Sequence, residues 1–146
     1  MVWAAVIPLA AFAASRPDLA PAAYAFVLGV YAIGHVICHQ LPVRSFHLWS
    51  VSLPVCARCT GIYAGAAATS LALVSGIAGP TRPERAPDNS VARTRRLLFV
   101  VLVPTALTLA YEWTTGIMPS NWIRALAGFP LGAAAAWLIG TVNLEQ

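Results

Sequence analysis

Five apolar stretches separated by polar connections dominate the chain, covering residues 2–15, 20–38, 59–79, 97–113 and 122–142. The hydrocarbon core of a bilayer is about 30 Å thick, and the four later stretches are long enough to cross it as helices. The first would reach only about 21 Å as a helix. We therefore predict an all-α, polytopic transmembrane helical bundle of about five helices, or four if residues 2–15 do not span.

Composition supports a membrane environment for the whole chain. Of the 146 residues, 59% are hydrophobic and only 10% are charged, with a mean hydropathy of +0.73, whereas a soluble domain carries roughly 25% charged residues. Residues 1–146 are therefore predicted to form one integral membrane domain whose main partner is the lipid bilayer. The nine basic residues are all arginine. Because no basic aromatic platform accompanies them, nucleic acid is not expected as a partner.

The connection at residues 80–96 sets the expected orientation. It holds five arginines and three prolines without apolar periodicity, which is typical of a flexible linker, and the positive-inside rule makes it cytoplasmic. Counting crossings then places the 39–58 and 114–121 connections outside, in a multi-pass protein of the cell membrane. A cleaved signal peptide over residues 1–14 is the rival interpretation, but that segment lacks a basic first region.

All three cysteines fall within 22 residues, at the predicted outer ends of two neighbouring helices. His35, Cys38 and His39 have the i, i+3, i+4 spacing that shares one face of a helix. Cys56 and Cys59 repeat the i, i+3 spacing at the start of the next helix. Three thiolates and one imidazole suit tetrahedral zinc. The predicted metal ligands are Cys38, Cys56, Cys59 and His39, with His35 as the alternative histidine.

Other interpretations of these cysteines stay open. They could be small buried hydrophobic residues, the common fate of a free cysteine. A Cys-x-x-Cys pair at a helix start beside Arg58 also suits a thiol–disulfide oxidoreductase that uses Cys56 and Cys59 with a membrane quinone. A third interpretation is an accessory subunit of a larger membrane complex or a homo-oligomer. Whether the protein is an enzyme is left open.

Charged and polar residues at the same predicted level form a candidate pocket. Glu112 could pair with the arginines there as structural support, or serve as a metal ligand or proton acceptor. Ser120 and Asn121 precede the last helix, where capping is the first expectation. A four-residue repeat of small residues (Gly61, Gly65, Gly128, Gly132, Ala136 and Gly140) predicts closely packed membrane helices. The candidate pocket residues are His35, Gln40, Arg44, Arg58, Tyr63, Glu112, Asn121 and Arg124.

The segments "CHQLPVRSF", "PVCARCTGIYAG" and "SNWIRALAGFPLG" together resemble an uncharacterised family of small bacterial and archaeal membrane proteins, a domain of unknown function. The resemblance covers roughly residues 35–140 and implies a polytopic membrane bundle, with no established activity. The family often has an acidic residue and a downstream glutamine before the Ser-Asn pair. Glu112 matches the acidic residue, and residues 113–119 contain no glutamine. The matching positions are Cys38, His39, Gln40, Arg44, Ser45, Phe46, Cys56, Arg58, Cys59, Gly61, Tyr63, Ser120, Asn121, Arg124 and Gly128.

Overall fold

The computed structural model describes residues 2–77 and 90–143, and each of the five apolar stretches is a helix in it. This confirms the prediction of an all-α protein. Between the second and third helices lie one turn of 3₁₀-helix and two very short antiparallel strands. In chain order the elements are α1 (Val2–Ala14), α2 (Pro21–Ile37), η1 (Pro42–Arg44), β1 (His47–Leu48), β2 (Val51–Ser52), α3 (Ala57–Val74), α4 (Ser90–Thr115) and α5 (Asn121–Asn143).

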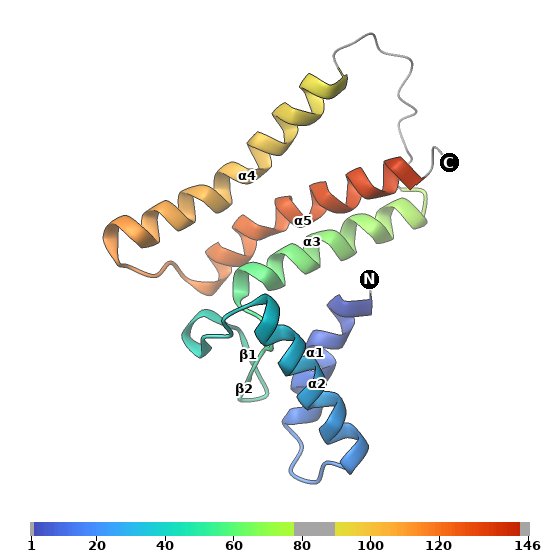
Figure 1. Cartoon of the computed structure of the whole chain (residues 1–146), viewed down its shortest axis with the longest axis vertical. Coiled ribbons are helices and arrows are strands. Elements are labelled where there is room, and N and C mark those ends of the chain that lie inside the picture. Colours follow the sequence, from blue (N-terminus) through green and yellow to red (C-terminus); the bar gives the residue numbers. More distant parts are fainter. Residues whose placement is uncertain (1, 78–89, 144–146) are drawn as a thin grey trace.

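Helices α3 and α5 lie side by side and make the most extensive contact between elements (Figure 1). They run parallel, because Gly61 of α3 meets Ala125 of α5 and Gly65 meets Phe129 one turn further on. Helix α4 ends at the short connection to α5, and its beginning lies farther from the α3–α5 pair than its end does (Figure 1). Helices α1 and α2 form a hairpin that points away from the long axis of α3 and α5. The starts of α3 and α5 therefore lie at the same end of this helix pair (Figure 1).

Small residues let α3 and α5 approach each other this closely. A Cβ atom added at Gly61 or Gly65 would overlap a backbone carbonyl oxygen of α5. In the opposite direction, one added at Gly128 or Gly132 would overlap the carbonyl oxygen of Arg58 or Ile62. Four glycines on two helices thus interlock, as expected for membrane helices whose association depends on close backbone packing. The predicted small-residue stripe is confirmed at these four positions.

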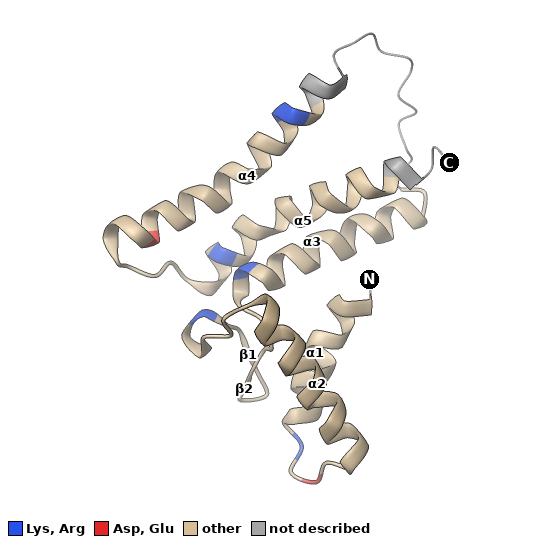
Figure 2. Ribbon diagram, viewed as in Figure 1, with Lys and Arg blue, Asp and Glu red and all other residues tan. Residues whose placement is uncertain are grey.

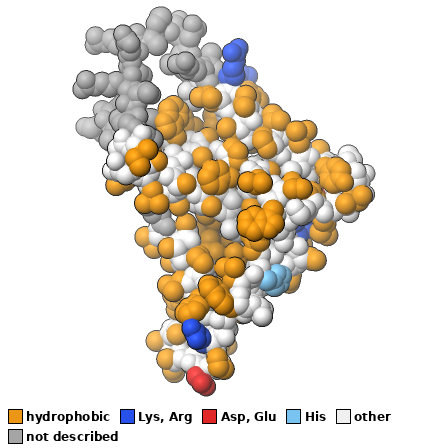
Figure 3. All heavy atoms as spheres, turned by 180° about the vertical axis from the view of Figure 1, so that it is seen from behind, with side chains coloured by type: hydrophobic (Ala, Val, Ile, Leu, Met, Phe, Trp, Pro, Cys, Tyr) orange, Lys and Arg blue, Asp and Glu red, His pale blue; other side chains and the backbone are white. Residues whose placement is uncertain are grey.

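The outer surface of the helices is strongly apolar. Val36, Val74 and Trp113 are more than 80% exposed, and most large side chains on α4 are also exposed. Figure 3 shows hydrophobic side chains spread over one whole face, with few charged groups, mainly toward its upper and lower ends. Contiguous apolar surface on this scale exceeds what soluble monomers expose. Lipid is the solvent that suits it.

Within the described residues, two helical segments are long and apolar enough to cross a membrane, Thr94–Thr115 and Asn121–Gly140. Helices α1 and α2 are apolar but shorter, at 13 and 17 residues. As straight helices these would extend about 20 and 25 Å. Five crossings are therefore not established by length and hydropathy; the crossings of the other helices stay predictions.

Two predicted boundaries differ from the structure. Helix α4 begins at Ser90, so the predicted linker at 80–96 is wrong over residues 90–96. The rest of that prediction, residues 80–89, lies outside the described residues. Arg95 and Arg96 are good helix formers, and Arg95 lies over the ring of Phe99, 5.7 Å from its centroid, so charge alone did not mark the end of helical structure. Helix α2 ends at Ile37, so it contains His35 but ends one residue before Cys38, the last residue of the stretch predicted at 20–38.

Candidate metal centre

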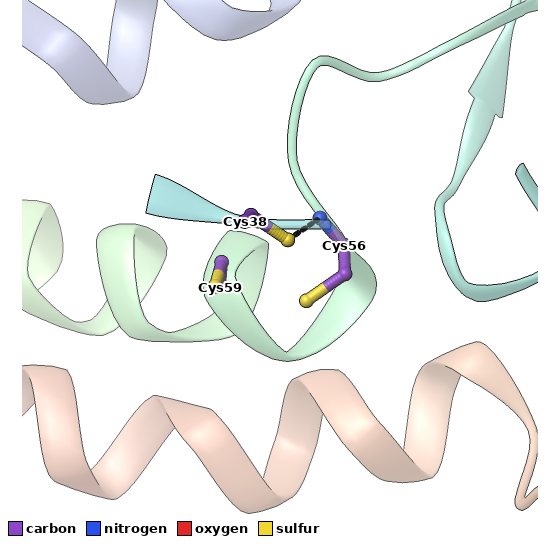
Figure 4. Close-up of side chains that lie close together, drawn as sticks. All are labelled: Cys38, Cys56 and Cys59. Atoms are coloured by element: carbon purple, nitrogen blue, oxygen red, sulfur yellow. Dashed lines mark hydrogen bonds between the residues drawn. The ribbon is translucent and has the colours of Figure 1, made fainter. Parts of the chain in front are cut away.

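Two backbone segments, the end of α2 and the start of α3, bring the cysteines together. Cys38 is the residue that follows α2, in extended conformation with φ −144° and ψ 141°. Cys56 is the N-cap residue of α3, also extended, and Cys59 lies in the first turn of that helix. Their three sulfur atoms all lie within 4.8 Å of one another. Figure 4 shows the three side chains gathered around the start of α3.

A set of side-chain bonds to the backbone fixes the segment after α2 against the segment before α3. Gln40 adopts φ 47°, and its Nε2 atom donates to the carbonyl oxygens of Tyr31 and Pro54, at 2.7 Å each. The Tyr31 hydroxyl donates to the Ser52 carbonyl oxygen at 2.6 Å. Gly34 faces the same crossing, where a Cβ atom would overlap the Pro54 carbonyl. Cys38 is therefore held at a fixed distance from Cys56.

The start of α3 favours negative charge on sulfur. The backbone N–H of Cys56 donates to Cys38 Sγ at 3.2 Å (Figure 4), and a donor to sulfur stabilises a thiolate. The positive end of the α3 dipole acts in the same direction. A hydrogen bond with the Cys59 thiol lowers the pKa of the Cys56 thiol to about 5, against the opposing effect of burial.

The predicted histidine ligands, His35 and His39, do not belong to the cluster of three sulfur atoms. The predicted helical face of His35, Cys38 and His39 is wrong, because α2 ends one residue before Cys38. Cys38 has an extended backbone, so helical spacing no longer places His39 beside it. Both histidines are exposed, and among the described residues the cluster contains sulfur ligands only. Ligation by either histidine stays a prediction.

The other face of the first α3 turn carries a charge cluster. Glu112, near the end of α4, is 8% exposed and lies within ion-pair distance of three arginines. Its Oε1 atom is 2.6 Å from Arg124 Nη2 and 3.4 Å from Arg58 Nη2, and its Oε2 atom is 4.0 Å from Arg44 Nη1. Figure 2 shows acidic and basic positions gathered at this end of α3, α4 and α5. The predicted pairing of Glu112 with the arginines is thus observed.

Neighbouring residues orient this charge cluster. Arg58 Nη2 also donates to Thr108 Oγ1 at 3.2 Å, and Thr105 Oγ1 donates to the Ala127 carbonyl oxygen at 2.8 Å, which joins α4 to α5. Asn121 Nδ2 donates to the Ser45 carbonyl oxygen at 3.0 Å. The capping contact predicted at the start of α5 comes from Ser120, whose Oγ accepts from the Ile123 N–H at 3.4 Å.

Helix α3 separates the two clusters. Cys59 and Tyr63 pack against an apolar core that includes Ile7 of α1 and Val55. Arg58, one residue before Cys59, instead extends toward Thr108 of α4. Consecutive helix residues point about 100° apart, so one turn of α3 supplies a sulfur to one cluster and a guanidinium to the other.

Sequence reasoning missed several residues that support these clusters. Tyr31, Thr105 and Thr108 lie inside apolar runs, where nothing in the pattern separates a bonding hydroxyl from a packing one. Ser45 is completely buried and was identified only through the family resemblance. Pairs of hydroxyls one turn apart, such as Thr105 and Thr108, are the one signal that could have identified them, because polar side chains within membrane helices seek partners.

An apolar exterior around two clusters of polar side chains defines the class of an integral membrane protein. The chain belongs to the family described as "Predicted membrane protein (DUF2085)", whose model matches residues 38–138. The matched region contains all three cysteines and all four members of the charge cluster.

Two archaeal relatives are similar in sequence. The uncharacterized protein MJ1492 of Methanocaldococcus jannaschii is 33% identical over 121 residues, covering 80% of this chain and 70% of that protein. An uncharacterized protein of Methanothermobacter thermautotrophicus is 32% identical over 103 residues, covering 70% of this chain and 83% of its own length. No solved structure matches the chain.

Proposed function

We propose that this protein is a metal-binding membrane protein in which Cys38, Cys56 and Cys59 hold one zinc ion at the outer membrane face. The observation that carries the proposal is the mutual approach of the three sulfur atoms, within 4.8 Å. Sulfurs bound to one tetrahedral zinc at about 2.3 Å would lie about 3.8 Å apart. Shifts of about 1 Å therefore bring all three into ligand positions.

The surroundings suit a thiolate ligand set. The amide donor to Cys38 Sγ and the start of α3 both favour the deprotonated sulfur that metal binding requires. Zinc would join the end of α2 to the start of α3, so part of its binding free energy would stabilise the fold. The apolar core of described buried residues is small, centred on Ile7, Ala11, Leu53 and Val55. A metal ion bound next to it would add stability that so few buried side chains supply only in part.

The proposed orientation puts both clusters outside. Helices α3, α4 and α5 would cross the membrane, with the arginine-rich residues 82–96, which include the start of α4, on the cytoplasmic side in accord with the positive-inside rule. The short connection between α4 and α5 then lies outside with the cysteines. The end of α5 would then lie on the cytoplasmic side. A cysteine-free fusion reporter added after α5 tests this orientation.

A fourth ligand decides whether the site is structural or open. A closed four-ligand site is structural, whereas three protein ligands leave a position for water or substrate. We propose His39, the exposed histidine next to Cys38 in the chain, as the fourth ligand. His39→Ala would then weaken zinc binding by about tenfold or more. His47→Ala, at an exposed histidine of β1, is the matched control and should leave the affinity unchanged.

Metal analysis of protein purified in detergent is the main test. Wild-type protein should contain close to one zinc per chain, and Cys59→Ser should contain little. Loss of zinc in Cys59→Ser with an unchanged gel-filtration profile supports ligation by that sulfur. Wild-type protein free of metal after purification in zinc-containing medium would refute the proposal.

The pairing of Cys56 with Cys59 at a helix start supports a second candidate function, a thiol–disulfide oxidoreductase. In that reaction the two thiols would form one disulfide, and a membrane quinone would take up the two electrons and two protons to become a quinol. Alkylation of free thiols in intact cells distinguishes the two functions. A Cys56–Cys59 disulfide at steady state would favour the oxidoreductase, because a disulfide cannot supply two thiolates to zinc.

A further inference from the structure

The charge cluster around Glu112 is unbalanced. Three guanidinium groups lie within 4.0 Å of one carboxylate, which leaves an excess of two positive charges. Asp18 is the other acidic residue in the described part of the chain, and it lies in the distant α1–α2 connection. Solvent screens the charge of Arg44, whose side chain is 39% exposed, whereas Arg58 and Arg124 are 17% and 3% exposed and share the one carboxylate. Buried charges are ordinarily compensated, so the remaining buried positive charge calls for an anion.

The helices increase the excess. Arg58 lies in the first turn of α3 and Arg124 in the first turn of α5, and these parallel helices start at the same end. Each helix start carries about half a positive charge. The end of α4 contributes the opposite partial charge near Glu112, which compensates one of the two helix starts. The site therefore remains net positive after every described group is counted.

The guanidinium groups also have donors to spare. The Nε atoms of Arg44, Arg58 and Arg124 are buried and have no hydrogen-bond partner among the described residues. Arg124 is only 3% exposed, so water does not readily replace the missing acceptor. Buried polar atoms are nearly always bonded, and an unbonded group in a native structure points to a missing water or ion. The three guanidinium groups come from three separate elements, η1, α3 and α5, and each lies within 4.0 Å of Glu112.

We propose that Arg44, Arg58 and Arg124 form a binding site for a phosphate group at this end of α3 and α5. Planar guanidinium groups match phosphate oxygens through paired hydrogen bonds, and a phosphate carrying one to two negative charges matches the excess. Arg124 is held by Glu112, and the Arg44 side chain is 39% exposed, which makes it the entrance to the site. The phosphate belongs either to a lipid headgroup or to free inorganic phosphate.

The site is independent of the proposed zinc. Arg58 faces α4, and Arg44 follows Cys38 by six residues on η1, so neither side chain belongs to the sulfur cluster. Loss of phosphate binding with unchanged zinc content therefore concerns this site alone.

Two probes test the proposal on full-length protein that has been delipidated in detergent. Inorganic phosphate is titrated by calorimetry, and binding of phosphatidylglycerol against phosphatidylcholine is measured by native mass spectrometry. The variants are Arg44→Gln and Arg58→Gln. Arg95→Gln, on the opposite end of α4, is the matched control, and zinc content is measured on every sample.

Wild type and Arg95→Gln should bind at least one of the probes saturably, and both Arg44→Gln and Arg58→Gln should weaken that binding tenfold or more. Binding of inorganic phosphate would identify a free anion as the ligand, whereas binding of phosphatidylglycerol alone would identify a headgroup. The proposal is overturned if wild type binds neither probe, or if either variant that keeps the wild-type gel-filtration profile binds as tightly as Arg95→Gln. If one of the two variants does not fold, the other decides the outcome.

Discussion

Replacing Glu112 by glutamine removes the one negative charge from the arginine cluster and keeps the shape of the side chain. Glu112 and Arg124 are both buried, with side chains 5% and 3% exposed and 2.6 Å between the paired atoms. Removing one partner of a buried pair costs about 3–5 kcal/mol. The lower end applies, because the glutamine oxygen can still accept a hydrogen bond. Arg44 adds little, since its side chain is 39% exposed and solvent screens the interaction.

A loss of about 3 kcal/mol lowers the melting temperature of a chain of this size by roughly 6–12 °C. Far-UV circular dichroism during heating in detergent measures the shift. Asp18→Asn makes the same chemical change at an exposed carboxylate between α1 and α2, and should melt within about 2 °C of wild type. If Glu112→Gln also melts within that margin, the cluster is not the buried, charge-dependent link described above.

Three further predictions concern packing, the segment after α2 and metal removal. Gly132→Ala should lower stability by about 1–3 kcal/mol in the same thermal assay, because its Cβ atom would overlap the Ile62 carbonyl. Gly29→Ala is the control: Gly29 has open space around it, so the change should be neutral or slightly stabilising. Equal effects of the two substitutions would contradict the interlocked packing of the glycines. Gln40→Leu removes the Nε2 donor from two carbonyl oxygens and should lower the free energy of unfolding by about 1–3 kcal/mol, with a measurable loss of zinc. Full stability in this variant would show that Gln40 does not fix the segment after α2. A zinc chelator should lower the melting temperature of wild type and not that of Cys59→Ser, and an identical shift in both would show that the metal acts elsewhere.

The helices were predictable because lipid-facing helices need apolar side chains on nearly every side. Runs of about twenty apolar residues therefore marked four of the five, and α1 was recognised as a short one. The ends were less predictable. Helix α2 ends at Ile37, and the segment after it is held by bonds such as that from Gln40 Nε2 to the Pro54 carbonyl oxygen. A contact across 14 residues leaves no local pattern in the sequence.

The candidate site was predictable in membership more than in geometry. Polar residues at helix ends on the same side of the membrane are expected to lie near one another. Arg58, Glu112 and Arg124 could therefore be placed together from the sequence. Which face of α3 each residue takes depends on how α3 packs against α5, and this follows from glycines meeting backbone carbonyls. For that reason the sequence could not show that Cys59 and Arg58 serve separate clusters. Spacing suggested His39 as a neighbour of Cys38 on a helix, and the extended backbone there removes that basis.

Zinc K-edge X-ray absorption on wild-type protein tests the central claim most directly, because it counts the atoms around the metal. We expect three sulfur neighbours at about 2.3 Å and one nitrogen or oxygen neighbour at about 2.0 Å. A shell of nitrogen and oxygen atoms without sulfur would show that the cysteines do not hold the ion.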